Sequence, residues 1–131
     1  MLIERESMLT GKVNVMEMNE LKDILAEAEE KADNAGRYYF YEQLGGVDRY
    51  ACGFAWVNIY SYKGENIKGN TKLGRLLKKA GVYQDYQRIF QVWMPGRQPV
   101  QNIDCHYASA KAYADVLTDY GFVAYANSRL D

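Results

Sequence analysis

The run Ala51–Ser61, ACGFAWVNIYS, constrains the fold of this chain more than any other segment. It is an apolar run with a single amide, Asn58, and its apolar residues do not alternate with polar ones. That pattern is typical of an inner strand covered on both faces of a sheet. Two further apolar runs, 88–94 and 122–126, predict two more strands. The sequence therefore predicts a sheet of three short strands.

Three segments between and before these strands have the spacing of helices. They are residues 19–44, 71–80 and 105–120, and the expected N-caps are Asn19, then Asn70 or Thr71, then Asp104. Helices and strands therefore alternate along the chain, which favours crossover connections. We predict an α/β domain, with α+β as the alternative, in which a small parallel or mixed three-stranded sheet packs with about three helices.

Size and composition indicate one ordinary globular domain over residues 1–131. Residues 1–15 have no clear pattern, and we expect them to form a peripheral N-terminal segment. The formal net charge of −1 gives no reason to expect nucleic acid or an anionic membrane as partner. No segment has transmembrane length, and two cysteines without a secretory signal suggest reduced thiols in a cytoplasm.

The charge is unevenly distributed along the chain. Acids crowd residues 17–33, whereas lysines and arginines crowd residues 63–79. The two regions are either ordinary solvated helix faces or a self-complementary surface, and the basic one could bind an anion. Twelve tyrosines add side chains that suit half-buried positions and interfaces. We therefore expect a homo-oligomer.

A catalytic or metal site has weak support in the sequence. Cys105 and His106 follow Asp104, but adjacent helical residues point about 100° apart, so the thiol and imidazole rarely serve each other. Cys52 could meet His106 only through the fold. The single histidine and the absence of a Cys-x-x-Cys pair disfavour zinc. We predict no catalytic residue, metal or cofactor, and keep a small Cys/His-dependent hydrolase or nucleotide-modifying enzyme as an alternative.

A non-catalytic binding site has better support. Trp56 and Trp93 lie on strands expected to be neighbours, and Asn58 is a lone amide in an apolar strand. Ligands of open α/β sheets sit outside the carboxyl ends of strands, where these side chains could converge. Aromatic faces, amides and a guanidinium suit a small anionic or nucleotide-like molecule. The predicted ligand-binding residues are Trp56, Asn58, Tyr60, Arg75, Trp93 and Arg129.

Four pieces of the sequence together resemble a group of small uncharacterised proteins of tailed bacteriophages. They are CGFAWVNI at 52–59, QVWMPG at 91–96, the alanine-rich helix before a Tyr-Gly pair at 108–121, and SRLD at 128–131. The resemblance covers roughly residues 17–131.

The resemblance to phage proteins implies a setting for the chain. It implies an accessory protein in the host cytoplasm that counters host defence by binding a nucleotide-like ligand or a host protein. A purely structural protein–protein interaction module is a further alternative.

Overall fold

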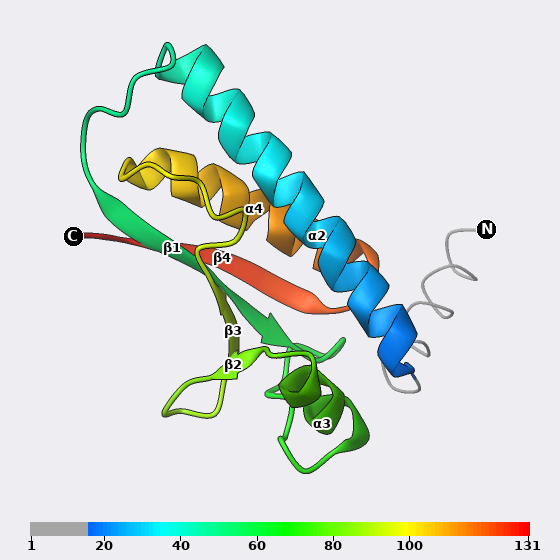
Figure 1. Cartoon of the computed structure of the whole chain (residues 1–131). Coiled ribbons are helices and arrows are strands. Elements are labelled where there is room, and N and C mark those ends of the chain that lie inside the picture. Colours follow the sequence, from blue (N-terminus) through cyan, green and yellow to red (C-terminus); the bar gives the residue numbers. More distant parts are fainter. Residues whose placement is uncertain (1–15) are drawn as a thin grey trace.

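The computed structural model describes residues 16–131, so the predicted peripheral segment 1–15 lies outside the described residues. The elements, in chain order, are α2 (Met18–Tyr38), the π-helical η1 (Tyr39–Gln43), β1 (Gly53–Tyr60), α3 (Lys72–Lys79), β2 (Tyr83–Gln84), β3 (Phe90–Trp93), α4 (Ile103–Asp119) and β4 (Val123–Leu130) (Figure 1).

The sheet has four strands in the order β2-β3-β1-β4, and every neighbouring pair is antiparallel. The prediction of a three-stranded parallel or mixed sheet is therefore wrong, and the α+β alternative is right. β2 was missed because its two residues, Tyr83–Gln84, are too few to show a period. Its hairpin with β3 provides the antiparallel pairing.

The predicted crossover connections exist, but each joins strands that are not neighbours. β1 and β2 run parallel with β3 between them, and β3 and β4 run parallel with β1 between them. α3 makes the first connection and α4 the second. This is the β-α-β-β-α-β order of the split β-α-β motif, preceded here by α2.

The helices within residues 16–131 cover one face of the sheet and leave the other without a helix. α2 and α4 pack against each other on the same side of β1 and β4, and α3 lies near one end (Figure 1). Burial alternates along β1, with Ala55, Val57 and Ile59 buried and the residues between them half-buried. The expectation of a strand covered on both faces is therefore wrong. The apolar pattern does not reveal the uncovered face of β1, because most side chains on that face are aromatic rather than charged.

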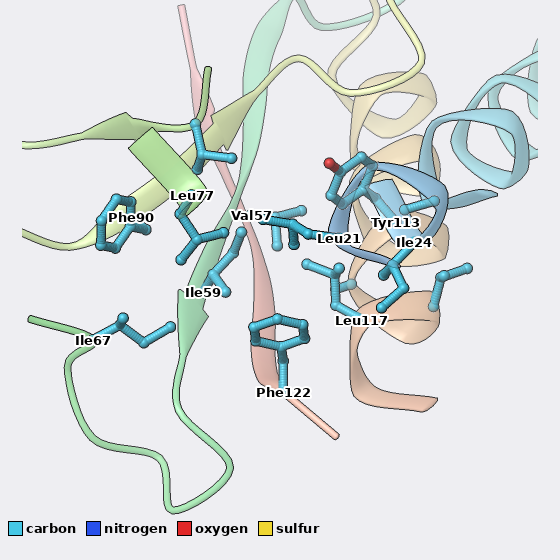
Figure 2. Close-up of a cluster of buried hydrophobic side chains, with 14 of the residues drawn as sticks. Leu21, Ile24, Val57, Ile59, Ile67, Leu77, Phe90, Tyr113, Leu117 and Phe122 are labelled. Carbon is cyan, nitrogen blue, oxygen red and sulfur yellow. The ribbon is translucent and has the colours of Figure 1, made fainter. Parts of the chain in front are cut away.

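The core lies between the helices and the covered face of the sheet. Figure 2 shows Leu21 and Ile24 of α2, and Leu117 of α4, facing Val57 and Ile59 of β1. Burial of such side chains contributes about 25 cal/mol per Å² of apolar surface. The core therefore covers one face of the sheet, and no described helix covers the other.

One predicted N-cap is confirmed, whereas two other caps and one strand end differ from the predictions. Thr71 is confirmed as the N-cap of α3, because its hydroxyl accepts from Gly74 N at 3.1 Å. Asp104 is not the cap of α4, since Asn102 Oδ1 accepts from Cys105 N at 2.8 Å. Asn19 lies inside α2, after its first residue. β4 extends to Leu130 rather than ending at 126, because polar residues suit an exposed edge strand.

Candidate functional site

The open face of the sheet collects aromatic and amide side chains from all four strands. Strand register places alternate residues of each strand on this face. These residues are Phe54, Trp56, Asn58 and Tyr60 of β1, Tyr83 of β2, Gln91 and Trp93 of β3, and Val123, Tyr125, Asn127 and Arg129 of β4. An antiparallel sheet with an open face normally shows polar side chains there, so the aromatic content requires an explanation.

Trp56 and Trp93 form the centre of this face. They are direct partners across β1 and β3, and their rings stack with centroids 4.7 Å apart and planes inclined by 17°. Met94 N donates to Ala55 O at 2.9 Å, so the adjacent Trp56–Trp93 pair is a non-hydrogen-bonded one, where side chains approach most closely. Trp93 nevertheless remains 42% exposed.

Gln91 fixes the polar groups beside the two indoles. Its Nε2 donates to Asn58 Oδ1 at 2.8 Å, and its Oε1 accepts from Trp93 Nε1 at 2.9 Å. Gln91 is only 7% exposed and also donates to Asp85 Oδ2 at 3.3 Å. The hydrogen-bonding capacity of the Asn58 amide is thus satisfied at its oxygen. Within residues 16–131 its Nδ2 has no acceptor.

A cleft of about 540 Å³ opens beside Trp93 at the edge of β3. β2 pairs only with Phe90 and Gln91, so on the side of β3 away from β1 no described strand continues beside Val92 and Trp93. Side chains of α2 and α4 close its other side. The polar and aromatic groups that line it are Glu29, Tyr83, Gln91, Trp93, Arg97 and Tyr113. This volume lies in the range of small-molecule sites.

Tyr113, a buried residue of α4, lines the cleft. The residue is 3% exposed, and its hydroxyl bonds to no group in the described part of the chain. Figure 2 shows this oxygen on the side of the ring away from Leu117 and Phe122. Burial, with the negative charge of Glu29, raises the pKa of the phenol. The hydroxyl therefore stays protonated and can donate to a ligand.

Two charged groups meet at the cleft, Glu29 from α2 and Arg97 from the loop after β3. Glu29 Oε1 accepts from Gly96 N at 2.9 Å, which leaves its second oxygen free to accept from a ligand. The guanidinium of Arg97 has no partner among residues 16–131. Met94 and Arg97 have φ angles of 48° and 45°, a left-handed conformation that is uncommon outside glycine. Such conformations cluster at ligand-binding sites.

The structure brings together some of the six predicted site residues and separates others. Trp56, Asn58 and Trp93 lie side by side on the open face. Tyr60 lies farther along the same face, with its ring 5.9 Å from that of Tyr125. Arg129 pairs with Phe54 at the opposite end of β1, because β4 runs antiparallel to it.

Arg75 does not share this face. It lies on α3, and its guanidinium donates to Asn70 O. The expected convergence at the carboxyl ends of parallel strands therefore does not occur, since the strands are antiparallel. The other five predicted site residues share one face of the sheet, but they do not meet at one end of its strands.

Sequence reasoning missed several residues of the cleft. Gln91 carried a usable signal, because it is a lone amide between apolar residues, as Asn58 is. Glu29 and Arg97 have no such signal, because in the sequence they resemble ordinary surface charges. Only the packing of α2 against the loop after β3 brings them to the cleft.

The two cysteines and the histidine have structural contacts. Cys105 Sγ donates to Gly36 O at 3.3 Å, and burial, followed by the charge of Asp48, raises the pKa of its thiol to about 11. His106 is 1% exposed, with Nε2 at 2.7 Å from Val100 O. Cys52 Sγ donates to the side chain of Gln101. In the described residues no hydrogen bond joins either thiol to the imidazole, so the geometry offers no activated nucleophile.

Residues 16–131 contain neither a metal-binding cluster nor a membrane-spanning helix. No group of three or more His, Cys, Asp or Glu side chains is placed to hold a metal ion. No described helix has the length and apolar character needed to cross a membrane. Comparison of the chain with protein-family models, curated proteins and solved structures finds no match.

Proposed function

We propose that this protein is a non-enzymatic binding protein whose ligand is a small nucleotide-like molecule. The observation that carries the proposal is the exposed ring of Trp93, stacked on Trp56 and bordering a cleft of about 540 Å³. Base–aromatic stacking contributes about 1–3 kcal/mol per base. A planar heterocycle would stack on the face of the Trp93 ring that does not contact Trp56.

The polar groups of the cleft suit the rest of such a ligand. The guanidinium of Arg97 would pair with a phosphate oxygen. The free oxygen of Glu29 would accept from a ribose hydroxyl or a base amino group, and the Tyr113 hydroxyl would donate to a base or sugar acceptor. Each of these groups has hydrogen-bonding capacity that no described residue uses.

The cellular role follows from the resemblance to proteins of tailed bacteriophages. We propose that binding sequesters a nucleotide-like signal in the host cytoplasm and so counters host defence. A role in binding a host protein would use the same open face, since aromatic side chains are enriched at protein interfaces.

Tryptophan fluorescence tests the ligand directly. The chain has two tryptophans, and both lie on the open face, so their emission reports on this site. Titration with each of the four ribonucleoside 5′-monophosphates should quench the emission for at least one of them. Trp93→Ala should weaken that binding about tenfold or more, measured by calorimetry, because the stacking surface is lost.

The control is Tyr38→Ala, which removes an aromatic side chain that is 64% exposed at the end of α2. It should leave the affinity unchanged. Absence of quenching by all four nucleotides up to millimolar concentration would contradict the proposal. So would equal affinities of the Trp93→Ala and Tyr38→Ala proteins.

We also propose that the protein forms a homo-oligomer through the outer edge of β4. This strand has eight residues in unbroken register with β1, contains no proline, and has no described strand on its other side. Long regular edges readily pair with another strand, and a second copy offers the same edge across a two-fold axis.

Light scattering with one pair of variants tests this edge. In the ladder, the backbone N–H of Ser128 points away from β1. Ser128→Pro should therefore shift the protein to monomer without breaking the sheet, whereas Ser128→Ala should not. An unchanged mass for Ser128→Pro would argue against pairing through β4.

A further inference from the structure

A second cleft, of about 550 Å³, lies on the other side of β2 from the Trp93 cleft. Its walls come from the loop before α3, from α3 itself and from the β2–β3 hairpin. The two clefts share no lining residue, because Tyr83 faces the first and its neighbour Gln84 faces the second. The second cleft is therefore a separate site.

The charged side chains that line the second cleft, among residues 16–131, are all positive. Lys68, Lys78 and Arg88 line it, each from a different wall, together with Asn66, Gln84 and Gln87, and no described carboxylate does so. Within the described residues none of these three cations forms an ion pair. Other lysines of the protein do, since Lys72 pairs with Glu17 at 2.8 Å and Lys111 with Asp115 at 2.7 Å.

The ammonium of Lys78 lies close to the backbone of Gly69 inside the cleft. A Cβ built on Gly69 would lie 2.5 Å from Lys78 Nζ, so a side chain there would move the ammonium from its present place. Gly69 does not have the positive φ that demands glycine. A substitution at Gly69 therefore acts on the position of the Lys78 ammonium rather than on the backbone conformation.

The hairpin holds Arg88 in a defined place. Its φ is 64°, and its carbonyl accepts from Gln84 Nε2 at 3.0 Å. The nearest acid of the hairpin, Asp85, accepts from two backbone N–H groups, Gln87 N and Ile89 N, each at 2.8 Å. These bonds direct its carboxylate into the turn, and Asp85 does not line the cleft.

We propose that this cleft binds a small, multiply charged phosphate anion, such as a linear polyphosphate. Three unpaired cations on three walls suit an anion with several charges, which can contact all of them at once. A nucleic acid strand is a poorer fit, since the chain as a whole carries a net charge of −1. The site is independent of the nucleotide site at Trp93.

Calorimetric titration with inorganic tripolyphosphate tests the site. Binding should occur and weaken as salt rises, because the charges are exposed. Lys78→Gln and Arg88→Gln should each reduce the affinity about tenfold, the effect expected for loss of a charged hydrogen bond. Gly69→Ala should reduce it similarly by displacing the ammonium of Lys78.

The matched control is Lys111→Gln, which removes the same charge from α4, outside the cleft. It should leave the affinity unchanged. Equal loss in Lys111→Gln and Lys78→Gln would overturn the site, because it would indicate non-specific attraction, and so would absence of binding at low salt.

Two further results separate this site from other sites and ligands. Trp93→Ala should still bind tripolyphosphate with full affinity, even if no nucleotide binds at Trp93. Loss of tripolyphosphate binding in Trp93→Ala would overturn the claim of a separate site. Tighter binding of a single-stranded oligonucleotide than of tripolyphosphate, with the same sensitivity to Lys78→Gln, would overturn the ligand class.

Discussion

The two faces of β1 contain neighbouring residues of one strand but have opposite physical roles. Ala55, Val57 and Ile59 point to the helices and are almost completely buried. Trp56 and Asn58, which alternate with them, point to the open face and remain half-buried. Apolar character along a strand therefore does not by itself say which of its faces is covered.

The two faces also differ in how their polar groups are satisfied. The covered face is almost free of polar side chains, whereas the open face holds Gln91 bonded to both Asn58 and Trp93. A buried polar group without a partner costs about 1–3 kcal/mol, so this bonding makes the open face rigid without a covering layer. A rigid, exposed aromatic surface is suited to binding because little ordering is needed when a ligand arrives.

The largest expected contrast is between Phe90 and Trp93, which lie on opposite faces of β3. Phe90 is fully buried, so Phe90→Ala should lower the free energy of unfolding by about 3–5 kcal/mol. Trp93→Ala should cost no more than about half of that, since Trp93 is 42% exposed. Urea unfolding followed by circular dichroism measures both. Similar losses for the two variants would refute the assignment of faces.

A pH effect should distinguish the helix-side interior from the open face. Burial raises the pKa of the Cys105 thiol from 9.0 to about 11. The folded state thus holds this proton longer than the unfolded state does. The resulting stability is complete below pH 9 and is lost as pH rises to about 11, by about 2 kcal/mol.

Urea unfolding between pH 8 and 11 measures this loss. The raised pKa of Tyr113 acts in the same direction at more alkaline pH. Cys105→Ala should reduce the slope between pH 9 and 11, whereas Cys52→Ala, at a half-buried position, should not. A slope that Cys105→Ala leaves unchanged would show that another group causes the loss.

The sequence predicted the elements better than their arrangement. The strand at 51–61 and the helices at 71–80 and 105–120 are confirmed within a few residues, because each has a strong apolar pattern or a stop signal. The sheet direction was wrong because it depends on β2, whose two residues leave no periodic pattern. Pairing partners are set by tertiary contacts, which a local pattern does not contain.

The candidate site was predictable only where one strand pair forms it. Trp56, Asn58 and Trp93 stood out as large or polar residues in apolar runs, and they do lie together. Glu29, Arg97 and Tyr113 reach the cleft from α2, a loop and α4. Such a meeting of distant segments follows from the packing of helices on the sheet, which no spacing in the sequence records.

A smaller effect is expected from the bonding of the open face. Gln91→Ala leaves Asn58 Oδ1 and Trp93 Nε1 without their partner and should lower stability by about 1–2 kcal/mol, less than Phe90→Ala. It should also weaken nucleotide binding, because the Trp93 ring loses its anchor. Urea unfolding and calorimetry measure the two effects. A variant with lower stability but full affinity would show that the anchor of Trp93 does not matter for the ligand.

The smallest effect is expected from Tyr125, on the same open face but away from the cleft. Its ring lies 5.9 Å from that of Tyr60, and it is 58% exposed. Cross-strand aromatic pairs contribute about 0.2–1 kcal/mol, so Tyr125→Ala should lower the free energy of unfolding by less than about 1 kcal/mol. Nucleotide affinity, measured by calorimetry, should not change. A clear loss of affinity would mean that the ligand covers the whole open face, from Tyr125 to Trp93, rather than the cleft alone.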